Sequence, residues 1–107
     1  MASFYKNAKV DLTTTGATTL YTAPAATTAI FKSILVADDS GSTSTITATL
    51  TDSASAVFVL FNVKATSANT TVELLTQPLV VQESEILKVT AANANRLHVV
   101  GSYIEIS

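Results

Sequence analysis

The alternation of hydrophobic and polar residues is clearest in residues 45–63, TITATLTDSASAVFVLFNV. In the first half, threonines alternate with Ile46, Ala48 and Leu50, and successive side chains of a strand point to opposite faces. This half therefore predicts a half-buried strand with one face in water. A turn of small residues follows at 52–55. The second half is apolar on both faces, which predicts a central strand or a strand covered by another subunit.

Alternation with a period of two recurs along most of the chain, between segments rich in turn-forming residues. We expect further strands at residues 3–12, 17–22, 29–37, 70–76, 86–91 and 97–106, with a short apolar crossing at 79–81. No segment shows the sustained apolar stripe of a helix. The chain is thus predicted to be all-β with little or no helix, a single antiparallel β-sandwich or jelly-roll-like domain of about eight strands over residues 1–107. Residues 1–12 are expected to form a first strand or a partly free N-terminal arm.

Strict alternation also predicts which side chains face the core. Phe4 and Val10 should point inward from the first strand. The apolar residues of 29–37 fall on both faces, with Phe31 and Leu35 on one and Ile30, Ile34 and Val36 on the other.

Glycine and asparagine mark special backbone positions. Gly16 is expected to take the positive φ of a tight turn, and Asn93 and Asn95 suit left-handed conformations in the last turn. Gly101 lies inside the last strand. It predicts a bulge, or a place where another backbone or a large side chain comes close.

The composition narrows the possible classes of protein. Charged residues make up 13% of the 107 residues, roughly half the usual share of about 25%. The net charge is −2 and the basic residues are scattered, so we expect no binding to nucleic acid. No run of 18 apolar residues and no secretory leader occurs in the sequence, and we expect no membrane span. With no cysteine, packing and assembly must stabilise the fold.

Candidate chemistry is sparse. His98 is the only histidine, and Ser102, four positions further on the same face of the strand, would lie roughly 13 Å away. We expect His98 to be partly buried or at a rim, without a catalytic role. Asp38 and Asp39, followed by Ser40 and Ser42, do not match the spacing of a calcium loop. The turn acids Asp52, Glu83 and Glu85 are expected to be solvated. We therefore predict no enzyme activity, no cofactor and no bound metal.

The predicted strands have more apolar faces than the core of a single two-layer sandwich can bury. Four predicted strands are apolar on both faces, whereas a two-layer sandwich buries one face of each sheet. Burial against identical copies accounts for the surplus, and we favour a homotrimer over a dimer. Aromatic residues are enriched at such interfaces. The candidates are Tyr103 and one of the pair Phe58 and Phe61, of which we select Phe58.

Four segments carry a resemblance to a known group of proteins: TTLYTAP (18–24), AIFKSILVAD (29–38), NTTVELLTQPLVVQESEILKV (69–89) and RLHVVGSYIEI (96–106). In them the chain resembles small structural proteins of tailed bacteriophages, especially those of marine and cyanobacterial hosts. The similarity covers nearly the full length and contains no active-site motif. The group usually has glycine and aspartate in the turn before the sixth or seventh strand, where this chain has Ser84 and Glu85.

The resemblance implies a virion structural protein, made in the bacterial host cytoplasm and located on the capsid surface. The implied function is that of a capsid decoration or cement protein, which binds the major capsid protein and stabilises its lattice. The alternative is a structural or host-glycan-binding module of the tail, neck or fibre. In that case the loop at residues 38–44 would be the binding tip, although it lacks the aromatic side chains that carbohydrate sites usually use.

Overall fold

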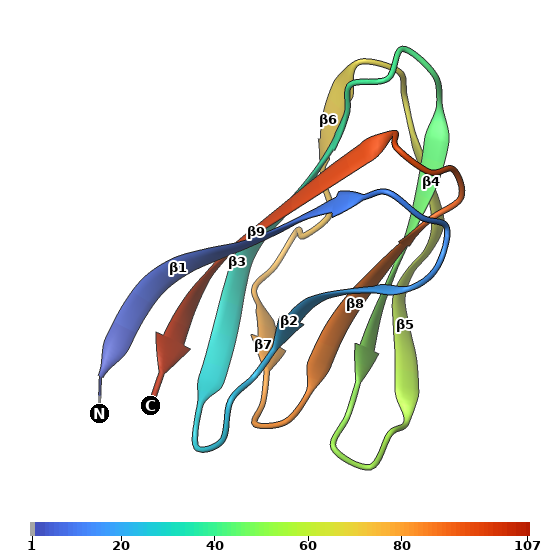
Figure 1. Cartoon of the computed structure of the whole chain (residues 1–107). Helices are drawn as coiled ribbons and strands as arrows, with labels where there is room; N and C mark the ends of the chain where they lie inside the picture. Colours follow the sequence, from blue (N-terminus) through green and yellow to red (C-terminus); the bar gives the residue numbers. More distant parts are fainter. Residues whose placement is uncertain (1) are drawn as a thin grey trace.

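The computed structural model describes residues 2–107, so Met1 of the predicted domain lies outside the described residues. It contains nine strands and, within these residues, no helix (Figure 1). The strands are β1 (Ser3–Leu12), β2 (Thr18–Thr22), β3 (Thr28–Asp38), β4 (Ser44–Thr51), β5 (Val57–Thr66), β6 (Thr70–Glu73), β7 (Leu79–Val81), β8 (Ile86–Ala91) and β9 (Leu97–Ile106). The all-β prediction is confirmed. No helix that could cross a membrane is found among the described residues.

The strands form two antiparallel sheets. Sheet A has the order β1-β9-β3-β6, and β7 also pairs with β3; sheet B has the order β2-β8-β4-β5. The pairs are nested, because β4 pairs with β5, β3 with β6 and β7, β2 with β8, and β1 with β9. The chain therefore forms one long antiparallel hairpin that reverses between β4 and β5. This hairpin wraps around the core, so that β3 also pairs with β9 and β4 with β8. This is the topology of a jelly roll.

The core lies between the sheets and follows the predicted alternation in most strands. Ile46 and Ala48 of β4 are fully buried and Leu50 is partly buried, while the threonines between them face the other way. In β8 the buried residues are Leu87, Val89 and Ala91. Local alternation therefore identifies the inner face of these strands.

In β3 the predicted faces are wrong because the strand contains a bulge. Its register with β9 shifts between Phe31 and Ser33, and one extra residue reverses the alternation. Phe31, Ile34 and Val36 are all buried, whereas Leu35 is 40% exposed. The carboxylate of Glu73 stabilises the bulge by accepting hydrogen bonds from the Ile34 amide (2.7 Å) and from the Ser33 hydroxyl.

The aromatic ring of Phe31 packs against Gly101, where the bulged strand β3 pairs with β9. A Cβ atom at Gly101 would lie 2.6 Å from Cε2 of Phe31. The Phe31 ring is itself held between Tyr103, stacked at a centroid distance of 4.7 Å, and Tyr21, at 5.3 Å edge-on. The expectation that a large side chain approaches Gly101 is confirmed.

The positive-φ predictions had mixed outcomes. Gly16 does not adopt a positive φ, and the glycine that does is Gly41. Asn95 has a φ of 62° in the last turn, as predicted, while Asn93 does not. In the turn before β8, Ser84 adopts the left-handed region, with a φ of 66°.

The two long edge strands match their predictions only in part. β1 pairs with β9 along its whole length and so is an edge strand rather than a free arm. Of the two residues predicted to face inward, Val10 is half-buried but Phe4 is 53% exposed. Phe4 lies near the start of β1, beside the C-terminal end of β9 (Figure 1). Of the two alternatives for 57–63, the central strand is wrong, because β5 pairs only with β4 at the edge of sheet B. Cover by another subunit stays a prediction.

Candidate interaction surfaces

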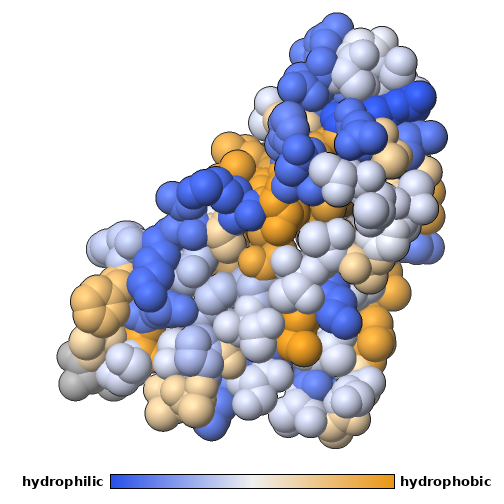
Figure 2. Space-filling view, in the orientation of Figure 1, coloured by the Kyte–Doolittle hydropathy of each residue, from blue (hydrophilic) through white to orange (hydrophobic). Residues whose placement is uncertain are grey.

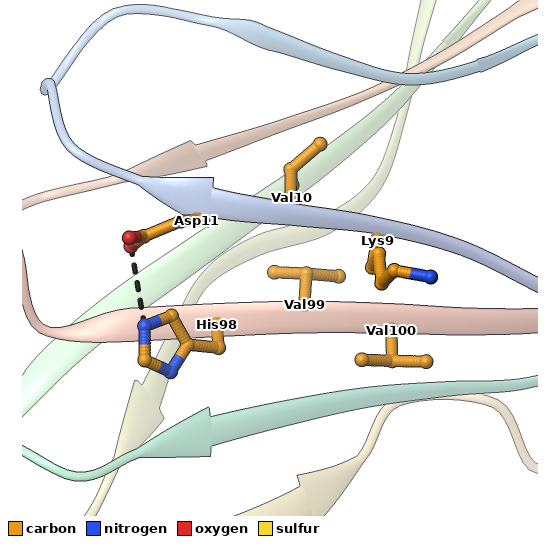
Figure 3. A pocket seen from close by; sticks show the side chains of 6 residues that line it. All are labelled: Lys9, Val10, Asp11, His98, Val99 and Val100. Atoms are coloured by element: carbon orange, nitrogen blue, oxygen red, sulfur yellow. Dashed lines mark ion pairs between the residues drawn. The ribbon is translucent and has the colours of Figure 1, made fainter.

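Two acidic side chains flank His98 on the outer face of sheet A, and one of them, Asp11, is drawn beside it in Figure 3. Its Nε2 atom lies 3.2 Å from Oδ1 of Asp11 at the end of β1, and its Nδ1 atom lies 3.7 Å from Oδ2 of Asp39 after β3. Sequence reasoning missed both neighbours; Asp11 faces His98 through the pairing of β1 with β9. All three side chains are about half exposed or more. His98 thus sits at a rim, as expected.

The geometry around His98 does not resemble a catalytic or metal centre. Its two carboxylate neighbours approach different ring nitrogens, so they do not converge on one point. His98 and Asp11 line a shallow pocket of about 250 Å³ together with Lys9 and three valines, Val10, Val99 and Val100, and its exposed lining is mostly apolar. Within residues 2–107 no three histidine, cysteine or acidic side chains are grouped so as to hold a metal ion.

Several acidic side chains serve as caps for their own turns. Asp38 is 2% exposed and accepts hydrogen bonds from the Ser40 amide (3.1 Å) and hydroxyl (2.8 Å). Asp52 accepts bonds from the amides of Ala54 and Ala56, each at 2.9 Å. These oxygen atoms stabilise the turns that join the strands.

A partly buried ionic network joins the two sheets at one end of the sandwich, with Lys6 about half exposed and Glu105 largely covered. The Glu105 carboxylate accepts hydrogen bonds from Lys6 Nζ (2.7 Å) and from the Tyr21 hydroxyl (2.6 Å). These bonds lower the pKa of Glu105, and the bond to Glu105 raises the pKa of Lys6. Burial raises the pKa of Tyr21 and of Tyr103. The network links β1 and β9 of sheet A with β2 of sheet B and stabilises the fold.

The more informative surface features are apolar. Nine large hydrophobic side chains are exposed among the described residues, and eight of them belong to two groups. Figure 2 shows apolar side chains gathered over the middle of the face in view and along the right-hand edge, where β5 lies in Figure 1. Grouped apolar side chains mark interaction sites more often than scattered ones do.

The first group, the sheet A patch, lies on the outer face of sheet A. Its exposed members are Tyr5, Leu35, Val80 and Val100, and its half-buried members are Ile30 and Ile104. Four of the six residues form one row across four strands, because Tyr5 pairs with Ile104, Ile104 with Ile30, and Ile30 with Val80. Ile30 and Leu35 are five positions apart and would lie on opposite faces of a regular strand. The bulge between them in β3 places both on this face.

The second group, the β5 patch, comprises Val57, Phe58, Val59 and Val63, each between 54% and 60% exposed. These side chains surround the edge strand rather than share one face, because Val57 and Val59 pair with Thr51 and Thr49, whereas Phe58 pairs with Leu50 of the inner face. Beside it, Leu60 and Phe61 line a shallow apolar groove against Leu75 and Leu79. The strand is irregular, since its register with β4 shifts twice.

The structure separates the two interface candidates predicted from the sequence. Phe58 is 54% exposed in the β5 patch, whereas Tyr103 is 7% exposed and stacked on Phe31 in the core. A side chain with so little surface cannot anchor a second subunit, so we retain Phe58 and withdraw Tyr103. The period-two pattern could not separate them, because a buried aromatic residue and an exposed one look alike in sequence.

No family model matches the chain, and neither a curated protein nor a solved structure matches it. The class that the fold and surfaces define is a jelly-roll β-sandwich domain with two exposed apolar patches.

Proposed function

We propose that this chain is a non-enzymatic structural protein of a tailed-phage virion, a decoration protein that binds and stabilises the major capsid lattice on the capsid surface. One support is the resemblance of the segments 18–24, 29–38, 69–89 and 96–106 to phage structural proteins. The observation that carries the proposal is the exposed apolar surface, eight large side chains in two patches on a chain of 107 residues.

Apolar contact suits a cementing function. The described residues contain no metal-ligand group and no buried side-chain polar atom without a hydrogen-bond partner, so the surface is the remaining place to look for function. Many weak apolar contacts repeated by capsid symmetry produce strong overall binding. Because only 13% of the residues are charged, such binding would depend little on salt concentration. The protein would also associate with itself, as the surplus of apolar faces indicates.

The first test is the copy number of the chain in purified virions, measured by quantitative mass spectrometry against the major capsid protein. A copy number comparable to that of the capsid protein supports decoration. A small number per particle would instead assign the chain to the tail or neck, and absence from the particle would refute a virion role.

The second test uses binding of the purified protein to capsids that lack it. Phe58→Asp places a charge in the β5 patch and Val80→Asp places one in the sheet A patch, both at exposed positions that the fold does not need buried. The matched control is Thr14→Asp, in the exposed turn after β1. We expect at least one patch variant to bind about tenfold or more weakly, and the control to bind normally. Full binding by both patch variants would exclude these surfaces.

A further inference from the structure

The outer edge of β1 is unpaired, and the pairing with β9 fixes which of its groups are free. In antiparallel strands, residues alternate between pairs that exchange two hydrogen bonds and pairs that exchange none. Ala2 and Ser107 exchange two, at 2.9 and 3.0 Å. The register then runs without a shift to Leu12 and Leu97. Even-numbered residues therefore bond to β9, and the amides and carbonyls of Ser3, Tyr5, Asn7 and Lys9 point away from the sheet.

Among the edge strands, β1 is the one suited to pairing. It has ten residues, no proline and no register shift. β5 is equally long, but it is bulged twice and Val63 adopts a φ of 50°. Bulges of this kind are a common protection of edge strands against pairing. β2, β6 and β7 have five, four and three residues.

We propose that β1 pairs with β1 of a second copy of this chain, antiparallel and about a twofold axis at Asn7. This dimer takes the place of the homotrimer favoured from the sequence, because the free edge of β1 accepts one partner strand. In this arrangement Asn7 faces Asn7 of the second copy, Tyr5 faces Lys9, and Phe4 faces Val10, each contact occurring twice as a twofold interface requires. The free amides and carbonyls of Tyr5, Asn7 and Lys9 then bond across the axis, and the two A sheets become one. This inference stands whether or not the chain is a virion protein.

The register follows from charge and from the free backbone groups. An axis one residue earlier would place Lys6 opposite Lys6, and like charges directly opposite one another are destabilising. An axis one residue later, at Ala8, would pair Tyr5 with Asp11, whose carbonyl already accepts a bond from the Thr13 amide at 3.0 Å. Only Asn7 and Lys9 would then bond freely across the axis. The axis at Asn7 lets Tyr5, Asn7 and Lys9 all bond across it, and it places the Lys9 ammonium beside the Tyr5 ring, a favourable cation–aromatic contact.

Pairing also accounts for exposed aromatic side chains. Tyr5 is 85% exposed and Phe4 is 53% exposed, and both would gain a neighbour across the axis. Lys9 is the partner of Val100, which in turn is the partner of Leu35. The row that runs from Val80 to Tyr5 would therefore continue into the second copy. The two sheet A patches would become one continuous apolar surface.

The first experiment measures the mass of the full chain in solution by light scattering over a dilution series. We expect a dimer of the 11.1 kDa chain. The variant Asn7→Pro removes an amide that points away from β9, a position where sheets tolerate proline. It should weaken dimerisation by about tenfold or more while leaving the circular dichroism spectrum unchanged. Asn7→Ala keeps the amide and should dimerise normally.

The second experiment tests the register by oxidative crosslinking, since the chain contains no cysteine. Two facing residues of a hydrogen-bonded pair have Cα atoms about 5.5 Å apart, within the range of a disulfide. Asn7→Cys should therefore crosslink to a dimer. Tyr5→Cys alone should not, because the two sulfur atoms would be separated by four residues, roughly 13 Å. The double variant Tyr5→Cys, Lys9→Cys should crosslink again.

Three results would overturn the proposal. The first is a wild-type chain that stays monomeric or forms a trimer. The second is a dimer that Asn7→Pro leaves intact and Phe58→Asp dissociates, which would place the contact in the β5 patch. The third is crosslinking of Tyr5→Cys as efficient as that of Asn7→Cys. None of these results bears on the virion copy number, so the two proposals fail separately.

Discussion

The packing of Phe31 against Gly101 predicts the effect of a single methyl group. In Gly101→Ala the new Cβ atom would lie 2.6 Å from Cε2 and 3.1 Å from Cδ2 of Phe31, and 3.5 Å from Leu20. Carbon atoms in contact are normally about 3.5–4.0 Å apart, so the ring or the strand must move by close to an ångström. Phe31 has no free space to move into, because it is fully buried between Tyr21 and Tyr103.

The size of the effect follows from two opposing terms. Overpacking a core by one methylene costs typically about 1–3 kcal/mol. Replacing glycine inside a strand recovers about 0.5–1 kcal/mol of backbone entropy. The net loss in free energy of unfolding is therefore centred on about 1 kcal/mol, with limits of about 0 and 2.5 kcal/mol. At the central value the midpoint of thermal unfolding should fall by roughly 4–8 °C. Differential scanning calorimetry and urea denaturation both measure this change.

The chain contains a matched control at Gly16. A Cβ atom there would meet only the Thr14 hydroxyl, at 3.8 Å, and the backbone does not adopt a positive φ. Gly16→Ala should thus stabilise the protein by about 0.4–1 kcal/mol, through the unfolded state. Combining Gly101→Ala with Phe31→Leu should cost less than the sum of the two single changes. Equal stability of the two alanine variants, or strict additivity of the double variant, would refute the reasoning.

Two further predictions concern the ionic network and a strained turn. Hydrogen bonds from Lys6 and Tyr21 hold the pKa of Glu105 below its ordinary value of 4.5, so its stabilisation is present above that pH and is lost as the pH falls through the lower folded-state pKa. Glu105→Gln should therefore lower stability at neutral pH and flatten its decline in acid, as measured by urea denaturation; an unchanged acid slope would contradict this. Ser84→Gly should raise the free energy of unfolding by about 1 kcal/mol, because glycine adopts a φ of 66° without steric cost. Ser53→Gly, at a residue outside the left-handed region, should lower it. Shifts of the same sign would argue against strain at Ser84.

The sequence predicted the strands well because alternation is a local property. The bounds expected for 3–12, 79–81, 86–91 and 97–106 coincide with β1, β7, β8 and β9. Their side chains alternate without interruption, or the strand is short and bounded by turn residues. The count of about eight strands differs from nine because the crossing at 79–81 is a strand of its own, pairing with β3.

The predictions that were wrong or incomplete have a common cause, the pairing of strands far apart in the chain. The bulge at Phe31 and Ser33 arises where β3 meets β9, some seventy residues later in the chain, so local alternation assigned Leu35 to the wrong face. The neighbours of His98 come from strand ends that meet only after the chain has rolled up. The apolar pattern of residues 57–63 is that of a central strand, but the nesting of pairs around the β4–β5 hairpin leaves β5 at an edge.

The sequence by itself determined that the chain is all-β, the bounds of its most regular strands, and that it has more apolar strand faces than one sandwich can bury. These properties follow from the period of the side chains, which neighbouring residues set. Only the tertiary structure decided where the surplus lies, in the sheet A patch and the β5 patch, and why Tyr103 is core while Phe58 is surface. Exposure depends on which strand lies beside and above each residue, and that is settled by pairs of strands far apart in the chain.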